Sequence, residues 1–412
     1  MWSAPFDVST VPAHGFTKVA IGDDGDAVFA WAAGGRIQTR SRSAAGELGP
    51  VVATSGPGAG VPRIAAAPGN GAVIAWLSSA PGGSRVQART RSADGRLGPI
   101  LAASRRGERA SGPRVSVAAN GAAVLAWTAV DAARRHPARI TATTLRAGTL
   151  KQPVVVASLE SGRGWRVATA ADGTAVFVWE RGQRTHRLVF ARMLSASGLT
   201  PAVAVSAAGS RALLPQVAVA ADGRALVAWT FSVPGASDNE LDRVQARWLS
   251  NSGRTAGPIV DVSTRTPYPD PQVAIDELTG GVVVWTQTRA ADGNQRVLTR
   301  ALSHGGRLAP TIELAPGLHV NRAKLATAAD GSATFSWLAS DATYSDTRIQ
   351  TRSRSADGVL GPLVTLASSV AGDVWPDADA YPQLAVGARG AAVVTWTHNA
   401  GQVATAQAAV RP

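Results

Sequence analysis

The sequence predicts an all-β protein, an eight-bladed β-propeller with four antiparallel strands in each blade. Three observations support this prediction: a phrase that returns about every fifty residues, a tight glycine turn in each copy, and two chain ends that complement one another. This repeated motif consists of two short strands in which apolar residues alternate along the chain, and it ends at a tryptophan. Its copies end at Trp31, Trp76, Trp127, Trp179, Trp229, Trp285, Trp337 and Trp396.

The first hairpin of a copy is clearest between Pro215 and Trp229, where Asp222-Gly223 separates two strands. Asp-Gly or Asn-Gly between alternating apolar residues is the strongest short hairpin signal, because both turn residues tolerate positive φ. Two copies replace the first turn residue but keep the glycine, as Thr279-Gly280 and Arg389-Gly390. We therefore expect strands A and B of every blade around this turn.

The second hairpin begins with an Arg-x-Gln-x-Arg phrase, for example from Arg243 to Arg247. A glycine turn and a strand led by Gly-Pro follow, as at Gly257-Pro258. Proline suits an outermost strand, where its missing N–H costs no ladder hydrogen bond. These segments are the predicted strands C and D. We expect the arginines of strand C to stack on the tryptophans or to hydrogen-bond along the blade surface.

The two ends of the chain predict how the array closes. The last copy stops after strand C, at Gln402 to Ala408, and the segment from Ala4 to Ser9 matches the strand D of Gly257 to Ser263. The N-terminal strand should therefore complete the last blade, three strands plus one. We predict a single propeller domain over residues 1–412, with repeats 1 to 8 at about 17–55, 62–104, 113–158, 165–206, 215–263, 271–315, 322–368 and 382–411 plus 4–9.

Composition narrows the possible partners. The chain has no cysteine, which excludes disulfides and thiolate metal sites. Its net charge of +13 comes almost entirely from arginines, many at fixed repeat positions, so nucleic-acid binding is not favoured. The sequence contains neither an apolar run long enough for a membrane span nor an intact signal peptide. We expect an extracellular or cell-envelope location, with any leader already removed.

Variation between the repeats predicts where function lies. The A–B and C–D turns are short and uniform, whereas the B–C and D–A connections differ strongly in length. The B–C loop is short at Ala32 to Gly35 but long at Thr230 to Asp242. In an up-and-down blade these two variable connections emerge on the same face. Loops held by a rigid scaffold are the usual carriers of binding and catalysis, so this face is the predicted functional face.

A long polar residue begins every predicted strand A, and these residues are the first candidate site. If they point into a central channel, their cations form a funnel that concentrates anionic ligands. The alternative is that they point between blades and bond backbone or cover tryptophans. The residues are Lys18, Arg63, Arg114, Arg166, Gln216, Gln272, Lys324 and Gln383.

Aromatic residues beside carboxylates in the variable loops form the second candidate site, because such platforms grip sugars. They are Trp375, Asp377, Asp379 and Tyr381 in one crossover, Tyr268 and Asp270 in another, and Tyr344 in a B–C loop. Packing of each loop on its own aromatic residue is the alternative. The eight repeated tryptophans are interpreted instead as packing between blades.

Catalysis and metal binding have little support in the sequence. The histidines are scattered without ligand spacing, and His304 is expected to be solvated in a C–D turn. Asp377 with Asp379, or Asp238 with Glu240 and Asp242, could hold calcium, but neither set has the spacing of a known calcium loop. We therefore predict no metal and no cofactor.

The whole chain resembles the repetitive, Ala/Arg/Gly-rich propellers of high-GC actinobacteria, which are exported and functionally undefined. The Asp-Gly turn and terminal tryptophan, as in Asp172-Gly173 and Trp179, are only distantly similar to the Asp-box of sialidase-like propellers. We could not place the arginine triad, tyrosine nucleophile and glutamate of those enzymes.

These observations favour a non-catalytic propeller that binds a glycan, especially an acidic or cell-surface one, or a protein through its B–C and D–A face. Two alternatives stay open. One is a polysaccharide-acting hydrolase or lyase with its site at the channel mouth, and the other is a scaffold component of an envelope assembly.

Overall fold

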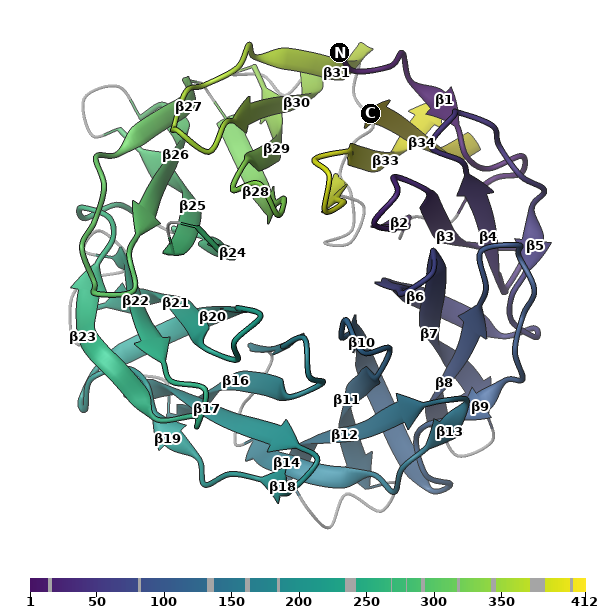
Figure 1. The fold of residues 1–412 in the computed structure, drawn as a ribbon, viewed down its shortest axis with the longest axis horizontal. Coiled ribbons are helices and arrows are strands. Elements are labelled where there is room, and N and C mark those ends of the chain that lie inside the picture. The colour runs from purple at the N-terminus through teal and green to yellow at the C-terminus, as the bar shows by residue number, and fades with distance from the viewer. Residues whose placement is uncertain are drawn as a thin grey trace. The chain divides into compact units, whose positions relative to one another are not determined.

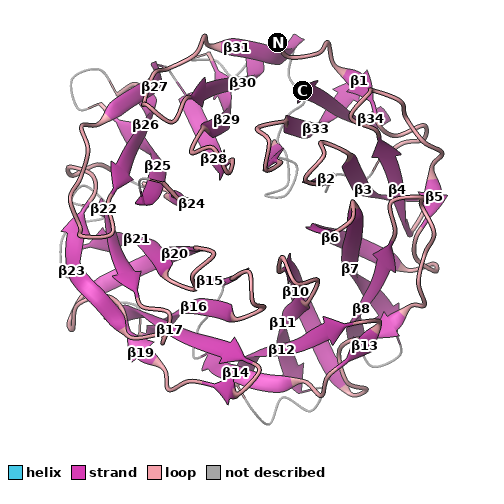
Figure 2. Cartoon of the chain, viewed as in Figure 1, coloured by secondary structure: helices cyan, strands magenta, loops and turns pink. Residues whose placement is uncertain are grey.

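The computed structural model describes residues 1–13, 17–80, 83–131, 137–159, 164–183, 186–233, 242–267, 269–278, 280–289, 293–316, 319–341, 346–370, 382–400 and 403–412. Every regular element within these ranges is a β-strand, and Figure 2 shows strands and loops without a helix. The chain divides into two compact units, one of residues 1–158 with 373–412 and the other of residues 159–372.

The first unit consists of four-stranded antiparallel sheets, one of which gains a fifth strand. The sheet orders are β2-β3-β4-β5, β6-β7-β8-β9, β10-β11-β12-β13 with β14 beside β12, and β1-β34-β33-β32. The strands are β1 (Phe6–Asp7), β2 (Lys18–Ile21), β3 (Ala27–Ala33), β4 (Arg36–Arg42), β5 (Val52–Ala53), β6 (Ala59–Ala67), β7 (Gly71–Ala80), β8 (Gly83–Arg91), β9 (Leu101–Ala102), β10 (Glu108–Val117), β11 (Ala123–Asp131), β12 (Ala138–Arg146), β13 (Thr149–Leu150), β14 (Val154–Leu159), β32 (Gln383–Val386), β33 (Ala392–Ala400) and β34 (Val403–Arg411).

The second unit has the same organisation. Its sheets are β24-β25-β26-β27, β28-β29-β30-β31, and a larger sheet in which two repeats are joined by one parallel bridge between Arg187 and Arg211. The strands are β15 (Trp165–Thr169), β16 (Ala175–Gly182), β17 (Arg187–Ser195), β18 (Gly198–Leu199), β19 (Val203–Ala204), β20 (Arg211–Val219), β21 (Ala225–Ser232), β22 (Arg243–Leu249), β23 (Thr255–Asp261), β24 (Gln272–Asp276), β25 (Gly280–Thr288), β26 (Gln295–Leu302), β27 (Ile312–Pro316), β28 (His319–Thr327), β29 (Ala333–Ser340), β30 (Asp346–Arg354) and β31 (Val364–Val370).

The A–B turns form as the Asp-Gly signal predicts. In repeat 5 the Ala220 amide donates to the Arg224 carbonyl over 2.8 Å, and Gly223 has a φ of 85°. The Asp222 carboxylate accepts from the Arg224 amide at 2.9 Å, which satisfies a turn donor that no strand reaches. In this turn the aspartate side chain accepts a backbone hydrogen bond, whereas the glycine adopts the positive φ.

The N-terminal strand completes the last repeat, as the complementary ends predict. Strand β1 pairs antiparallel with β34, placing Phe6 opposite Ala408 (Figure 1). The Ser9 hydroxyl accepts from the Ala406 amide at 2.9 Å, and Ser55, Ser104, Ser206 and Ser263 do the same for the C strands of their own repeats. The number of blades stays a prediction.

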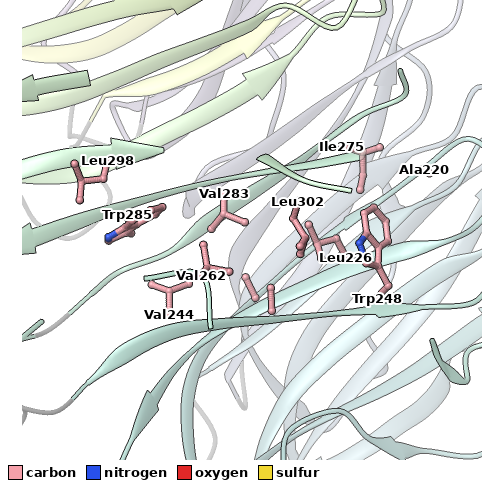
Figure 3. Packing of buried hydrophobic residues seen from close by; sticks show 12 residues of the cluster. Ala220, Leu226, Val244, Trp248, Val262, Ile275, Val283, Trp285, Leu298 and Leu302 are labelled. Carbon is pink, nitrogen blue, oxygen red and sulfur yellow. The ribbon is translucent and has the colours of Figure 1, made fainter. Parts of the chain in front are cut away.

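The hydrophobic core lies between successive sheets, not inside a single one. One cluster joins repeats 5 and 6, where Leu226, Val244 and Trp248 meet Val283, Trp285 and Leu302 (Figure 3). Apolar side chains from both faces of a strand are therefore buried. This explains why strand B is a nearly continuous apolar run, such as the fully buried β3.

Candidate functional site

Four of the polar residues predicted near the start of the A strands lie within the first two positions: Lys18, Arg166, Gln272 and Gln383. The other four lie at or beyond the middle of longer strands, after a bulge: Arg63, Arg114, Gln216 and Lys324. Each of the eight is paired across the ladder with the residue that immediately precedes the repeat tryptophan. Neighbouring residues of a strand point to opposite faces, and paired residues share a face. The polar side chains therefore lie on the face of their sheet opposite the tryptophan. The pairs are Lys18↔Ala30, Arg63↔Ala75, Arg114↔Ala126, Arg166↔Val178, Gln216↔Ala228, Gln272↔Val284, Lys324↔Ser336 and Gln383↔Thr395.

Contacts of this set run between adjacent repeats. The Arg166 guanidinium donates to the Gln216 side-chain oxygen at 3.0 Å, joining repeats 4 and 5, and also to the Trp165 carbonyl. Gln216 is buried, and its amide nitrogen has no hydrogen-bond partner among the described residues. Lys18 is buried as well. The anion funnel stays a prediction, since Lys18, Arg63 and Arg114 belong to one unit and Arg166 and Lys324 to the other.

Bulges position several of these residues. In repeat 5 the register shifts between Leu213 and Gln216, where Leu214 adopts a φ of 53° before a proline. Val61 and Gly112 occupy the same place with φ values of 54° and 55°. A bulge of this kind bends the strand and redirects the side chain that follows. The Leu214 amide is held by the Glu180 carboxylate at 2.8 Å.

Most of the predicted aromatic and acidic loop residues fall outside the described residues: Trp375, Asp377, Asp379, Tyr381, Tyr268 and Tyr344. Asp270 is described and half-buried. The carbonyl before it, that of Pro269, accepts a 2.6 Å hydrogen bond from the buried Thr230 hydroxyl. This D–A connection is thus anchored to the end of strand β21.

The eight repeated tryptophans are core residues, as predicted. None is more than 3% exposed. The indole nitrogens of Trp76 and Trp337 donate to Gln87 and Gln350, the central residues of their Arg-x-Gln-x-Arg phrases, at 3.2 and 3.1 Å. These tryptophans offer no open ring face for sugar stacking.

The last arginine of the phrase is a clamp between repeats. The Arg247 guanidinium donates to the Gly257 carbonyl of its own repeat at 3.0 Å and to the Val205 carbonyl of the preceding repeat at 3.3 Å. Arg40, Arg89, Arg300 and Arg352 form the corresponding pairs of bonds. These arginines therefore satisfy backbone carbonyls between outer strands, which accounts for part of the positive charge.

A polar groove of about 300 Å³ opens between repeats 5 and 6 in the second unit. Thr264 follows strand D of repeat 5, Gln287 ends strand B of repeat 6, and Arg296 begins strand C, so the groove lies at the B–C and D–A end of the sheets. Arg296 forms a 3.2 Å ion pair with Glu313. The remaining lining residues are Val262, Ser263, Trp285, Leu298, Arg300 and Thr311.

Hydrogen bonds hold the polar groups of this groove in place. The Gln287 oxygen accepts from the Trp285 indole at 3.3 Å, and its nitrogen donates to the Thr264 hydroxyl at 3.2 Å. The side chains of Arg296 and Glu313 keep 26% and 35% of their surface exposed. The groove therefore presents donors, acceptors and both signs of charge side by side.

Sequence reasoning missed this groove, although a signal was present. In repeats 1, 2 and 4 the strand-D residue at the position of Glu313 is alanine: Ala53, Ala102 and Ala204. Repeat 5 has Asp261 there, and it forms a 3.0 Å ion pair with Arg243. Repeat 8 has Asp7 at this position as well, where its carboxylate accepts from the Gln407 amide at 3.0 Å. Repeats 5, 6 and 8 therefore carry a carboxylate at an outer-strand position that is alanine in repeats 1, 2 and 4.

A second polar cluster lies where repeats 4 and 5 meet. Glu180 is buried and forms a 2.9 Å ion pair with Arg187. The backbone of Arg187 pairs with that of Arg211 in the parallel bridge between β17 and β20. The charge of Arg211 in turn acts on the buried Asp242 carboxyl. Burial raises the pKa of the Asp242 carboxyl, and the Ser232 side chain and the Arg211 charge oppose that shift.

The described residues contain no group of three or more His, Asp or Glu side chains that could hold a metal ion. Of the acidic residues considered for calcium, Asp242 is described, while Asp238 and Glu240 lie outside the described ranges. Within the same ranges, no helix is long and apolar enough to cross a membrane.

No family model matches the sequence, and no curated protein matches it. Solved structures do match. The polysaccharide lyase Uly1 is 10% identical, with 83% of this chain and 88% of that chain covered and a TM-score of 0.50. A prolyl endopeptidase structure is 15% identical at a TM-score of 0.53 over 93% of this chain, which spans about half (54%) of that chain. An α-L-arabinofuranosidase of Fusarium graminearum is 12% identical, with 75% of this chain and 93% of that chain covered and a TM-score of 0.44.

At these identities the likeness concerns the fold alone. The four-stranded antiparallel sheets in sequence and these neighbours together define an all-β protein of the β-propeller class.

Proposed function

We propose that the chain binds a carbohydrate in the groove between repeats 5 and 6. The observation that supports this most directly is the chemistry of its lining. An amide (Gln287), hydroxyls (Thr264 and Thr311) and an Arg296–Glu313 pair converge in about 300 Å³. Vicinal sugar hydroxyls each donate and accept, so they match a surface on which donors and acceptors alternate. The volume lies at the lower end of the range for small-ligand sites.

The position of the groove agrees with the predicted functional face. It opens where the B–C and D–A connections leave the sheets, and those are the connections that vary between repeats. Trp285 does not serve as a stacking platform, because it is 1% exposed. Its N–H instead fixes the orientation of the Gln287 amide, which leaves that amide pre-organised for a ligand.

The charge of the groove bears on the kind of glycan. Arg296 is neutralised by Glu313, so the pair does not select an anion by itself. Arg300 bonds the Val262 and Ala309 carbonyls. A neutral, hydroxyl-rich glycan is therefore the first candidate, and an acidic one is a separate arm of the test. The fold likeness to a polysaccharide lyase and the resemblance to exported propellers agree with a glycan met outside the cytoplasm.

A glycan array with soluble wild-type protein, followed by calorimetry on the best ligand, tests the proposal. The informative variant is Glu313→Ala, because alanine already occupies this position in repeats 1, 2 and 4 and the sheet tolerates it there. We expect at least a tenfold loss of affinity. Thr365→Ala is the matched control, since Thr365 holds the same position in repeat 7 and should change nothing. Absence of binding to any neutral or acidic glycan by the wild type would end the proposal.

A second candidate, cleavage of a polysaccharide, is favoured by the fold likeness to the polysaccharide lyase Uly1. Burial raises the pKa of the Asp242 carboxyl, which makes this group the candidate proton donor to a glycosidic oxygen. Incubation with neutral and uronate-containing polysaccharides would separate the reactions: hydrolysis adds new reducing ends alone, whereas elimination also creates an unsaturated uronate that absorbs in the ultraviolet. Asp242→Asn should abolish either activity. Product formation that survives this change would exclude Asp242 as the proton donor.

A further inference from the structure

A second cleft, of about 490 Å³, lies between repeats 2 and 3 in the first unit. It opens at the end of its sheets where the A–B and C–D turns lie, which is the opposite end from the B–C and D–A connections. Its walls are mostly apolar, with Val73, Thr90 and Leu97 from repeat 2 and Ala123 and Leu145 from repeat 3. No acidic residue is among the residues that line it in the described part of the chain.

The corresponding place is filled where repeats 5 and 6 meet. There Trp248, in strand C of repeat 5, packs against Leu302 of repeat 6 (Figure 3). Trp248 is 4% exposed, and its indole nitrogen donates to the Ser303 carbonyl at 3.0 Å. The His304 ring lies 4.4 Å from the indole, measured between centroids.

Two other pairs of neighbouring repeats show how the place is filled within a unit: a large residue meets leucine, or a small residue meets arginine. Met193 of repeat 4 packs in the same cluster as Leu249 of repeat 5. Between repeats 1 and 2, the small Ser41 accepts a 3.2 Å hydrogen bond from Arg91, whose long side chain occupies the space.

Repeats 2 and 3 have neither combination. Thr90 stands at the position of Trp248, and Leu145 stands at the position of Leu302, so a small residue meets a leucine. Thr144 and Leu194 give repeats 3 and 4 the same residue types at these positions. The C–D turn of repeat 3 is also tight, with Ala147 and Gly148 both at positive φ, and therefore adds no bulk at the mouth. The cleft is the space that the missing large side chain leaves.

We propose that this cleft binds a small aromatic molecule, of the size of an indole and carrying an N–H or O–H donor. The occupant is inferred from Trp248, whose ring fills the matching space between two apolar walls and satisfies its donor on the carbonyl that follows Leu302. The residue of repeat 3 that corresponds to Ser303 is Arg146, which directly follows Leu145. Apolar walls with few polar groups are the usual setting for such a ligand. This site is independent of the carbohydrate groove, which belongs to the other unit.

Fluorine NMR with 5-fluoroindole as the probe tests the proposal. Wild-type protein should give saturable binding in the low millimolar range or tighter. Thr90→Met copies Met193 and should fill the cleft, weakening binding at least tenfold and raising the melting temperature by a few degrees. Thr90→Ser keeps the cleft open and should bind like the wild type. A second filling variant, Leu145→Arg, copies the pairing of Ser41 with Arg91.

Two controls separate this site from the carbohydrate groove. Glu313→Ala should leave fluoroindole binding unchanged, and glucose should not displace the probe. The proposal is overturned if the wild type shows no saturable binding, or if a folded Thr90→Met or Leu145→Arg variant binds the probe as the wild type does. Displacement by glucose would also overturn it, because that result assigns the probe to a sugar site.

Discussion

The guanidinium of Arg40 donates a 3.2 Å hydrogen bond to the carbonyl of Val8. In the other repeats with this clamp, the same arginine position reaches the outer strand of the preceding repeat, as Arg89 reaches Thr54. Val8 therefore takes the place of an outer-strand residue although it begins the chain. The last repeat is built from both ends of the sequence, so its stability depends on holding the two ends together.

Deletion of residues 1–9 should destabilise the protein by several kcal/mol. It removes strand β1, takes away the buried Val8, and leaves the edge of β34 unpaired. Thermal unfolding followed by circular dichroism measures the effect. Deletion of Met1 alone is the control, because that residue is fully exposed. Equal melting temperatures for the two truncations would contradict the three-plus-one pairing.

Removal of the Ser9 hydroxyl tests the pairing of the N-terminal segment with strand β34 by a much smaller change. Ser9→Ala removes the hydroxyl that accepts from the Ala406 amide and leaves a buried N–H unpaired, which should cost about 1–3 kcal/mol. Ser104→Ala removes the equivalent hydroxyl within repeat 2, where no chain end is involved. Denaturant unfolding should give similar losses for both. A negligible loss for Ser9→Ala alone would show that the N-terminal strand is held more loosely than the others.

Local signals allowed much of this fold to be predicted. The Asp222-Gly223 turn, the apolar strand ending at Trp229 and the outer strand at Ala4 to Ser9 each depend on neighbouring residues or on an internal copy. Contacts between repeats were not predictable in the same way. Whether Thr90 meets a leucine or an arginine depends on a residue some fifty positions away, and the groove at Gln287 combines four separate segments.

His304 illustrates the same limit. The sequence places it in a C–D turn, where we expected a solvated side chain, and in the structure this side chain is half-buried. Its ring packs on Trp248, which comes from the preceding repeat and is larger than the residue at this position in any other repeat. The exposure of His304 therefore depends on the size of the side chain at the Trp248 position of the preceding repeat.

Leu226 and Gly281 should show a compensating pair of substitutions. Four residues before the tryptophan, every repeat has alanine except repeat 6, which has Gly281. A Cβ there would lie 2.1 Å from Leu226 Cδ2, and Leu226 stands where the other repeats have valine or threonine. Gly281→Ala should therefore cost about 1–3 kcal/mol through overpacking. Combined with Leu226→Val, the same change should cost much less. A double-mutant cycle from urea unfolding measures the coupling, and additive losses would contradict the steric account.

The stability of the protein should fall as pH drops through the titration of His304. Burial against Trp248 and then the nearby Arg224 charge lower the pKa of this imidazole below its usual value. The folded state therefore binds the proton more weakly than the unfolded state, in which the pKa is about 6.5. Stability from this group is complete above that pH and is lost as the pH falls through the lower, folded-state pKa. His304→Phe should reduce the drop in melting temperature between neutral and mildly acidic buffer, while His398→Phe on another repeat should not. Equal drops in all three proteins would exclude this linkage.

Asp276 and Arg354 form a buried pair that the protein should be able to lose together but not singly. Their charged atoms lie 3.9 Å apart, and both residues are at most 5% exposed. Burial lowers the pKa of the Arg354 guanidinium, and the Asp276 charge raises it again. Asp276→Ala leaves that guanidinium buried without its carboxylate, which should cost about 3–5 kcal/mol.

The double variant Asp276→Ala/Arg354→Leu should recover most of this loss, because it copies Ala220 and Leu302, the residues that hold these two positions where repeats 5 and 6 meet. Replacing a buried ion pair by packed apolar groups is often neutral. Chemical denaturation of both variants decides the question. A double variant that is as unstable as Asp276→Ala would mean that the pair holds repeats 6 and 7 together through its charges and not merely by filling space.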